Sequence, residues 1–332
     1  MPRRTSHGAS AGQPQWAGRK TDLHYSRMSL LERARRYFDY AYNRAGFETD
    51  RLPAALSEHA LQTARDLRGA SAGPAVLIHG ILPRSGTVYA GELLGLHPDL
   101  VRYPNQMWET PFLASAGRLG EAQRHFLDGY KQNRDRIAEN DFLPLFGAAF
   151  LHFLSAYGPA GRRLLLKTPS VQYLYLFFTV FPHENLLILL RDGRDVVAST
   201  IKSWPHLRFN DVCRRWDRSA RLILEFERRQ RDRPGWLRLK YEDAVAAPTE
   251  FLTAALQSFD LDRDRYPFEQ VSSLPVIGSS TTAEAGYIEI RKPRQFNPVG
   301  RWTAWSGWKR SMFKLIAGKS LLALEYCRDL TW

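Results

Sequence analysis

The sequence contains only two cysteines, Cys213 and Cys327, in 332 residues. Two cysteines are too few for the disulfide framework of a small secreted domain, and no CxxC pair or cysteine–histidine spacing predicts a zinc site. Long apolar runs are also lacking, because the opening residues hold no signal-peptide core and no window offers the roughly 20 uncharged apolar residues of a membrane span. We therefore expect a cytoplasmic protein with no membrane span and no metal centre.

Acidic residues are scarce relative to basic ones. The chain has 34 Asp and Glu residues against 47 Lys and Arg residues, which gives a formal net charge of +13. This balance favours an anionic partner, such as a nucleotide, a nucleic acid, an acidic peptide or a membrane surface. The length and the hydrophobic content of 44% are sufficient for a large buried core.

Composition and periodicity divide the chain into three segments. Residues 1–25 are rich in Gly, Ser, Arg and Gln without a repeating apolar pattern, which predicts a flexible basic arm. Residues 26–70 have helical spacing and predict an N-terminal helical extension, and residues 71–332 form the main domain. The residues that share one face of the predicted extension are Leu30, Ala34, Phe38 and Ala41.

Four short apolar runs mark the strands of the main domain. They comprise residues 75–78, 163–167, 185–191 and 236–243. Each run is rich in Leu or Val and is followed by a helical pattern, as in buried parallel strands joined by crossover helices. The sequence therefore predicts an α/β fold with a central parallel sheet flanked by helices.

Three helices are predicted from their start signals and apolar stripes. One begins with Ser170 as its N-cap, and another begins at Pro248, which occupies the favoured first-turn position. The third covers residues 211–232 and has an arginine-rich outer face. Its inward stripe consists of Val212, Trp216, Ser219, Ile223 and Phe226.

Residues 83–88, Pro-Arg-Ser-Gly-Thr-Val, join the first predicted strand to a helix. At this position a helix N-terminus offers unpaired N–H groups and a favourable dipole to an anion. Gly86 lets the backbone approach the anion, and the hydroxyls of Ser85 and Thr87 can donate hydrogen bonds. Arg84 can contact two oxygens at once. Taken alone, these residues fit a simple chain-reversing turn equally well.

The same loop lacks the lysine that nucleotide triphosphatases carry in the pattern GxxxxGK[ST]. No aspartate at a nearby strand end marks a magnesium site either. The loop therefore predicts an anion that is bound without a metal. A kinase-like phosphotransferase that uses ATP through an altered loop is the alternative.

A second anion motif lies in residues 185–204, which contain the third predicted strand and the helix that follows it. Arg191 ends the strand, and Ser199 stands eight residues later on the next helix. Since that helix returns along the sheet, both side chains can converge on one phosphate. The alternative is a surface cluster of exposed ion pairs that contribute little to stability. Its members would be Asp192, Arg194 and Asp195.

Together these two motifs resemble those of the sulfotransferases that use 3′-phosphoadenosine 5′-phosphosulfate (PAPS). The 5′-phosphosulfate loop of that family resembles PRSGTVY, and its 3′-phosphate motif resembles RDGRDVVAST. The arginine in the loop and the later His97–Pro98 are most similar to tyrosylprotein and related bacterial sulfotransferases. The resemblance covers about residues 75–305 and implies a P-loop-like sulfotransferase fold. It also implies sulfuryl transfer to a hydroxyl of a peptide tyrosine, a sugar or a secondary metabolite.

The resemblance assigns roles to the residues of both motifs. Val88 replaces the usual second threonine of the loop, so only its backbone is expected to contact the donor. Lys167 is similar to the strand-end lysine that contacts the bridging oxygen and the sulfuryl group. The residues implied in binding the 5′-phosphosulfate are Arg84, Ser85, Gly86 and Thr87, and those implied in binding the 3′-phosphate are Arg191 and Ser199.

The resemblance implies two further contacts with PAPS, from later segments of the chain. Tyr241 lies in a stretch similar to the Tyr-Glu-Asp strand of the family, which places it near the adenine. Arg301 lies in a stretch that resembles a late Gly-Arg-Trp segment. We favour Arg301 over Arg291 and Lys292 as the late contact of the 3′-phosphate.

The acceptor hydroxyl must lose a proton, which requires a base. Cytosolic phenol and steroid relatives use a histidine after the lysine strand, but residues 168–170 here read Thr-Pro-Ser. Tyrosylprotein and heparan-type relatives use a glutamate after the first helix, and Glu109 is the glutamate of that region here. We predict Glu109 as the base, with a carboxylate that favours a helix N-terminus as the alternative. His79 and His97 are expected to be packed or capping residues.

A basic nucleic-acid-binding protein is a third hypothesis. We do not expect a nucleic-acid partner, because the basic residues are spread over amphipathic helices and no binding motif occurs. The expected partner is a small-molecule or peptide acceptor that carries a hydroxyl. Tyr103, Trp108 and Phe112 suggest a flat or apolar acceptor, or else belong to the core.

Overall fold

The computed structural model describes residues 55–69, 73–133, 136–138, 140–274, 276–282, 286–291 and 298–332. The predicted basic arm and the apolar face of Leu30, Ala34, Phe38 and Ala41 lie outside these residues. Within the predicted extension, Glu58–Arg68 forms helix α2. Its N-cap Ser57 accepts a hydrogen bond from the Ala60 N–H and donates one to Asp141 at the start of α5 (Phe142–Ser155).

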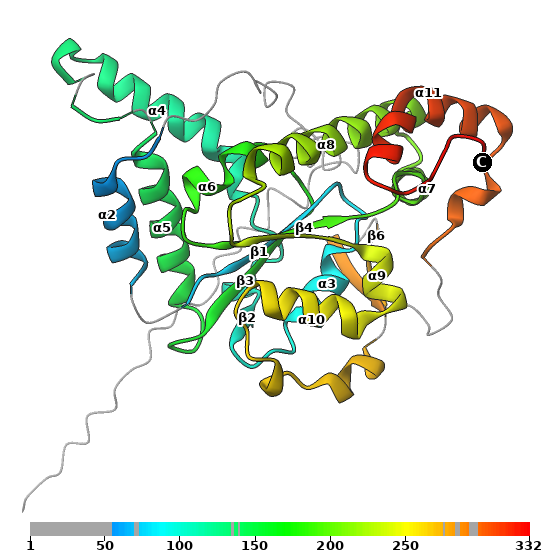
Figure 1. The fold of residues 1–332 in the computed structure, drawn as a ribbon, viewed down its shortest axis with the longest axis horizontal. Helices are drawn as coiled ribbons and strands as arrows, with labels where there is room; N and C mark the ends of the chain where they lie inside the picture. The colour runs from blue at the N-terminus through cyan, green and yellow to red at the C-terminus, as the bar shows by residue number, and fades with distance from the viewer. Residues whose placement is uncertain are drawn as a thin grey trace, which may run out of the picture.

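A five-stranded parallel sheet forms the centre of the molecule, in the order β2-β3-β1-β4-β5 (Figure 1). Its strands are β1 (Val76–Gly80), β2 (Leu100–Arg102), β3 (Arg163–Thr168), β4 (Asn185–Leu190) and β5 (Trp236–Lys240). The parallel sheet and the four predicted strands are confirmed. Because β1 lies between β3 and β4, the segments that follow these three strands meet at one edge of the sheet.

Alternating strand residues face two helical layers. In β4, Leu186 and Ile188 belong to one core, whereas Leu187 and Leu189 belong to the other. The first layer contains α5, α6 (Phe177–Val180), α7 (Gly193–Ser203), α8 (Phe209–Gln230) and α11 (Gly307–Ala323). The second contains α3 (Thr87–Leu94), α9 (Tyr241–Ala246) and α10 (Pro248–Ser258). Figure 1 shows α8 and α11 on the opposite side of the sheet from α3 and α10.

Two of the three predicted helices are confirmed. The predicted stripe of α8 is buried along its length, and α10 begins at Pro248. The helix predicted from Ser170 is wrong, because its hydroxyl accepts a hydrogen bond from the Gln172 N–H in a turn and Tyr173 adopts a φ of 56°. Only a short 3₁₀ turn and the single-turn helix α6 follow this break.

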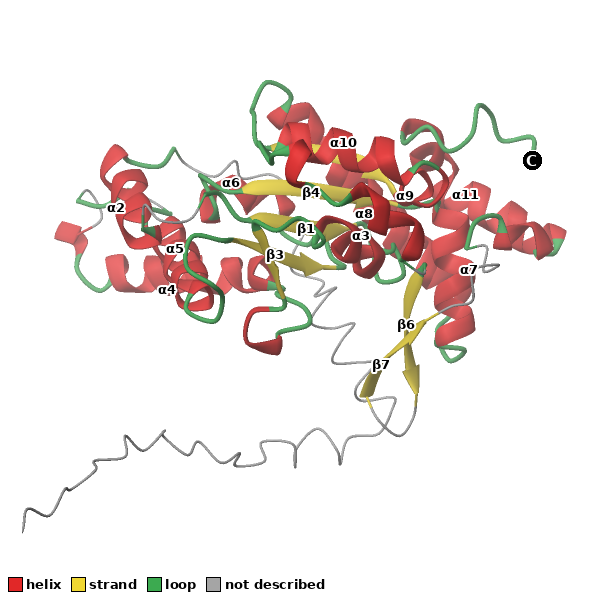
Figure 2. Ribbon diagram, turned by 90° about the horizontal axis from the view of Figure 1, so that it is seen from below, coloured by secondary structure: helices red, strands yellow, loops and turns green. Residues whose placement is uncertain are grey.

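Three strands were not predicted. Strand β2 has three residues, too few for a recognisable alternation. Strands β6 (Ile277–Thr282) and β7 (Gly286–Arg291) form an antiparallel hairpin that projects from the body of the molecule beside the end of α3 (Figure 2). Helix α4 (Ala116–Asp128) precedes α5 in the chain. None of the helices in the described ranges has both the length and the apolarity to span a bilayer.

Candidate functional site

The loop between β1 and α3 has an unusual backbone. Arg84 and Gly86 both adopt left-handed conformations, with φ values of 75° and 90°, and Gly86 is the N-cap of α3. A Cβ atom on Gly86 would lie 2.1 Å from Cδ2 of Tyr241. The loop therefore requires glycine here, both for the backbone angle and for the packing of the Tyr241 ring.

Ser85 supplies an observation that points to a ligand. Its side chain is fully buried, and its hydroxyl oxygen has no hydrogen-bond partner within the described part of the chain. An unpaired buried hydroxyl costs free energy unless a ligand completes it. Ser85 stands immediately before the N-terminus of α3, where the helix dipole favours negative charge. The loop is thus suited to an oxygen-rich anion.

The second predicted anion motif meets this loop directly. Arg191 follows β4, and its Nη1 donates a hydrogen bond to the Arg84 carbonyl oxygen at 2.5 Å. Ser199, on α7, accepts a hydrogen bond from Arg84 Nε at 3.2 Å. The Arg191 guanidinium also lies 4.6 Å from the centroid of the Tyr241 ring. The two motifs, more than a hundred residues apart in sequence, therefore form one site.

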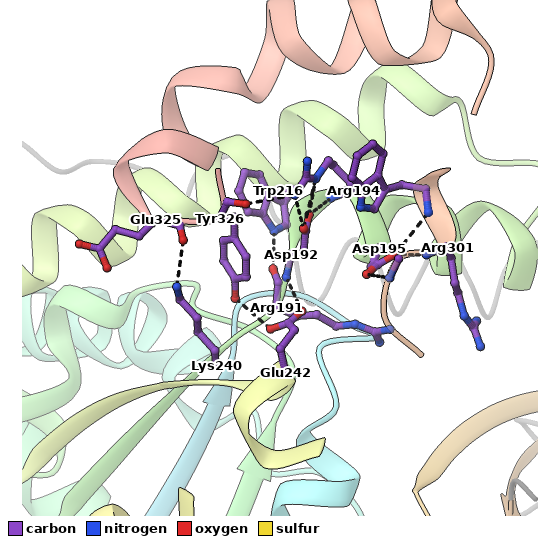
Figure 3. Close-up of polar contacts among 12 residues, drawn as sticks. Arg191, Asp192, Arg194, Asp195, Trp216, Lys240, Glu242, Arg301, Glu325 and Tyr326 are labelled. Carbon is purple, nitrogen blue, oxygen red and sulfur yellow. Dashed lines mark hydrogen bonds and ion pairs between the residues drawn. The ribbon is translucent and has the colours of Figure 1, made fainter. Parts of the chain in front are cut away.

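Buried polar contacts brace the turn after β4 (Figure 3). Trp216 Nε1 donates a hydrogen bond to the Arg191 carbonyl oxygen at 3.3 Å, and the Asp192 N–H donates one to Glu242 Oε1 at 3.0 Å. Asp192 also caps α7 and forms an ion pair with Arg194 at 2.7 Å. These contacts fix the backbone on both sides of Arg191.

The alternative of a surface cluster is wrong. Asp192, Arg194 and Asp195 are 7%, 6% and 0% exposed. The Arg194 guanidinium lies 4.0 Å from the Trp302 ring centroid and 4.6 Å from that of Trp332. The C-terminal part of the chain covers these charges, so they form an internal brace of the anion site.

The late Gly-Arg-Trp segment joins the same site through Asp195. Its carboxylate accepts hydrogen bonds from the backbone N–H groups of Gly300 at 2.8 Å and Arg301 at 2.7 Å. Burial lowers the pKa of the Arg301 guanidinium, and the positive charge of Arg191 lowers it further. Of the two less favoured candidates, Lys292 lies outside the described residues, and only the backbone of Arg291, in β7, is described.

Lys167 lies within β3, which neighbours β1, and is 5% exposed. Its ammonium nitrogen is 4.2 Å from the centroid of the Trp108 ring and 5.7 Å from that of Tyr103. These two rings stack on each other at 4.9 Å. The cation therefore rests against an aromatic pair that stabilises it in a buried position.

Glu109 is placed beside this lysine by the backbone. The N–H of its neighbour Thr110 donates a hydrogen bond to the Lys167 carbonyl oxygen at 3.0 Å, and Glu109 itself is half-buried. Phe112, by contrast, stacks on Phe150 at 4.5 Å and packs against the core. Of the predicted aromatic residues, Tyr103 and Trp108 thus contact the lysine, and Phe112 has a structural role.

The packed role predicted for His79 is confirmed, whereas the His97 ring bonds to backbone groups outside α3 and does not cap it. His79 is buried, and its Nδ1–H donates a hydrogen bond to the Ser170 carbonyl oxygen at 2.8 Å. His97 accepts a hydrogen bond from the Asp99 N–H at 3.1 Å and donates one to the Asp262 carbonyl oxygen at 2.9 Å. Both rings are therefore committed to backbone contacts.

Burial of His79 predicts a pH-dependent stability. Desolvation lowers its pKa from 6.5 to about 4, so between these values the unfolded state binds more protons than the folded state. We expect acidification from pH 7 to pH 4 to reduce the free energy of unfolding by up to about 3 kcal/mol through this residue. Urea unfolding at both pH values should show a smaller loss in His79→Asn, whereas exposed His206→Asn should behave as wild type. An equal loss in all three proteins would contradict this prediction.

Several braces of the site were not found from the sequence. Asp195, Glu242, Trp216 and Tyr326 hold the two motifs and the late segment together. Asp195 stands four residues after Arg191, in the first turn of α7, so it could have been noticed as an inward-facing acid. Tyr326 donates a hydrogen bond to Glu242 from 84 residues away, and nothing local marks it.

The fold and the site define a parallel α/β protein in which the segments after neighbouring strands share one candidate anion-binding site. The chain belongs to the sulfotransferase family, whose sequence profile matches residues 74–265, more than half of the chain. The match includes the loop after β1, the lysine strand and the motif after β4. The predicted resemblance is therefore confirmed.

Individual relatives are distant. Protein-tyrosine sulfotransferase 1 of Danio rerio is 21% identical over 238 residues, which are 69% of this chain and 65% of the relative. The protein-tyrosine sulfotransferase of Drosophila melanogaster is 24% identical over 242 residues, which are 69% of this chain and 47% of the relative. The chain thus spans less than two thirds of the length of either relative.

Solved structures of sulfotransferases share similarity with most of the chain. The sulfotransferase domain from the curacin biosynthetic pathway is 16% identical, with a TM-score of 0.45, and the comparison covers 75% of this chain and 98% of that domain. Mouse sulfotransferase SULT7A1 complexed with PAP is 13% identical, with a TM-score of 0.47. The comparison covers 82% of this chain and 92% of the mouse chain.

Proposed function

We propose that this protein transfers a sulfuryl group from PAPS to a hydroxyl of an acceptor. The observation that carries this proposal is the direct contact between the two anion motifs, in which Arg84 is bonded to both Arg191 and Ser199. A nucleotide with phosphate groups at both its 5′ and 3′ positions suits a site formed by two neighbouring strand-to-helix junctions. Membership in the sulfotransferase family supports the same donor.

The residues present fit this donor. The buried Ser85 hydroxyl needs a partner, and the N-terminus of α3 offers backbone N–H groups and a favourable dipole. Tyr241 packs beneath Gly86 and against the Arg191 guanidinium, so it supports both ends of the site beside the expected adenine. We assign the 5′-phosphosulfate to Arg84, Ser85, Gly86, Thr87 and the Val88 backbone, and the 3′-phosphate to Arg191, Ser199 and Arg301.

The bound donor would supply a sulfuryl group joined to a phosphate leaving group. Glu109 takes the proton of the acceptor hydroxyl, whose oxygen forms a new bond to sulfur as the bond to the bridging oxygen breaks. Lys167 and Arg84 stabilise the negative charge that develops on the leaving phosphate. Burial of Lys167 against Trp108 strengthens this interaction, because water is excluded around its ammonium.

The acceptor is a hydroxyl of a peptide tyrosine, a sugar or a secondary metabolite. The stacked rings of Tyr103 and Trp108 beside Lys167 favour a flat acceptor such as tyrosine. The names of the two relatives, both protein-tyrosine sulfotransferases, agree with that choice. A cytoplasmic location stays a prediction from the sequence.

Calorimetry with adenosine 3′,5′-bisphosphate (PAP), the product of donor turnover, tests this function. We expect PAP to bind in the presence of EDTA, because the proposed contacts come from protein groups alone. ATP with Mg²⁺ should bind at least about tenfold more weakly, since ATP lacks the 3′-phosphate and so loses charge-assisted hydrogen bonds to Arg191. Tight binding of ATP with Mg²⁺ and none of PAP would favour the kinase-like alternative instead.

Glu109 is tested against a second carboxylate near the same lysine. Glu92, on α3, forms an ion pair with Arg102 and accepts a hydrogen bond from the Tyr103 hydroxyl at 3.1 Å, so its oxygens are already engaged. We expect Glu109→Gln to lower kcat/KM by about 10²- to 10⁴-fold and to abolish the acidic limb of the pH–rate profile. Glu92→Gln should retain that limb. The reverse pattern would identify Glu92 as the base.

A further inference from the structure

Asp195 is a fully buried carboxylate that contacts backbone rather than another side chain of the anion site. It lies in the first turn of α7, four residues after Arg191. Its Oδ2 accepts a hydrogen bond from Gly300 N–H at 2.8 Å, and its Oδ1 accepts one from Arg301 N–H at 2.7 Å and a longer one from Trp302 N–H at 3.4 Å. Three successive backbone donors thus converge on one carboxylate.

The segment held in this way carries a candidate ligand of the nucleotide. Arg301 follows Gly300, whose φ of 81° turns the chain, and it opens a short 3₁₀ helix, Arg301–Ala304. Figure 3 shows the Arg301 side chain extending away from Asp195. Since Asp195 bonds to the backbone N–H of Arg301, it fixes the position of the Arg301 main chain. This bond does not involve the guanidinium, which stays available to the site.

The same segment is also tied to the 3′-phosphate motif by two other contacts. Arg191 Nη2 donates a hydrogen bond to the Pro298 carbonyl oxygen at 2.7 Å, and Arg194 stacks on the Trp302 ring. Besides burial, the positive charge of Arg191 lowers the pKa of the Arg301 guanidinium, so the two cations lie close together. Holding two cations together costs free energy, which an anion bound between them would offset.

We propose that Asp195 is a positioning residue for the 3′-phosphate, which fixes residues 300–302 so that Arg301 stands beside Arg191. This inference rests on the proposed function, because it assumes a nucleotide with a 3′-phosphate. Asp195→Asn removes the charge and replaces one acceptor oxygen with an N–H donor that faces backbone N–H groups. Residues 300–302 then lose the hydrogen bonds that fix their backbone, and Arg301 is no longer held beside Arg191.

A double-mutant cycle with two nucleotides tests this role. Affinities for PAP and for adenosine 5′-monophosphate, which lacks the 3′-phosphate, would be measured by calorimetry in wild type, Asp195→Asn, Arg301→Ala and the double variant. We expect each single variant to weaken PAP binding by about tenfold to hundredfold and to change adenosine 5′-monophosphate binding by less than about threefold. The double variant should bind PAP no more weakly than Arg301→Ala.

A matched control separates positioning from a general loss of stability. Asp217, on α8, is a second buried acid, which accepts a hydrogen bond from the Ser320 hydroxyl at 2.6 Å and forms an ion pair with Arg221. Asp217→Asn should lower the melting temperature without changing the ratio of the two affinities. If Asp195→Asn does not fold, Asp195→Glu keeps the charge but shifts the acceptor oxygens by one methylene, and the same loss of PAP selectivity is expected.

Two results would overturn the inference and leave the function intact. One is an equal loss of affinity for both nucleotides in the Asp195 variants. The other is an additional loss of PAP affinity when Asp195→Asn is combined with Arg301→Ala. A wild-type protein that binds no PAP would instead remove the proposed function, and the inference with it.

Discussion

Replacing Lys167 with methionine is expected to lower kcat by about 10²- to 10³-fold while the affinity for PAPS changes by less than about threefold. The ammonium interacts with charge that develops on the leaving oxygen during the reaction. Its removal therefore raises the free energy of the transition state more than that of the bound PAPS complex. Methionine preserves much of the length and volume of the buried aliphatic part of the side chain, whose ammonium lies against the Trp108 ring. Single-turnover kinetics and calorimetry with intact PAPS measure the two quantities separately.

An exposed lysine provides the control for the lost charge. Lys319 is an exposed residue of α11. Lys319→Met removes the same unit of charge and should retain full activity. A Lys167→Met protein that is as active as Lys319→Met would remove the lysine from the mechanism.

Replacing Gly86 with alanine is expected to weaken PAP binding by more than about 100-fold. The new Cβ atom would lie 2.1 Å from the buried Tyr241 ring, and the left-handed backbone alone costs an alanine about 1–2 kcal/mol. Relief requires movement of the loop or of Tyr241, and either movement displaces the backbone that faces the 5′-phosphate. Calorimetry with PAP on the folded variant provides the measurement.

Gly69 is a matched control for this substitution. It has a φ of 79°, and no atom lies within 4 Å of the position that a Cβ would take. Gly69, with a ψ of 145°, lies in a region that only glycine readily adopts, so Gly69→Ala carries a backbone cost without the clash. It should lower stability by about 1–3 kcal/mol while PAP affinity stays unchanged. If both variants bind PAP equally well, the loop after β1 does not form the phosphate site.

The sequence predicted the parts of the molecule that local patterns encode. Short apolar runs located four strands, and the signature of residues 83–88 placed a loop between β1 and α3. Arg191 and Ser199 were predictable as a pair because a strand end and the helix after it are fixed relative to each other. Those local signals located the two motifs, and the family resemblance implied that both contact one nucleotide.

Contacts between distant segments were not predictable in the same way. The bond from Arg301 to Asp195 joins residues 106 positions apart, and the exposed-cluster alternative arose because the covering Trp302 and Trp332 follow much later in the chain. The helix predicted at Ser170 is interrupted at Tyr173, which adopts a left-handed conformation that its local sequence does not predict. Whether a charged cluster is exposed or buried depends on which distant segments pack over it, and a single sequence does not show this packing.

A crystal structure of the complex with PAP tests most directly whether two strand-to-helix junctions bind opposite ends of one nucleotide. We expect the 5′-phosphate to accept hydrogen bonds from residues 84–87 and the 3′-phosphate to lie within hydrogen-bond distance of Arg191, Ser199 and Arg301. The adenine should lie beside Tyr241. A nucleotide bound in the reverse orientation, or one that contacts the loop after β1 without reaching Arg191, would contradict this account.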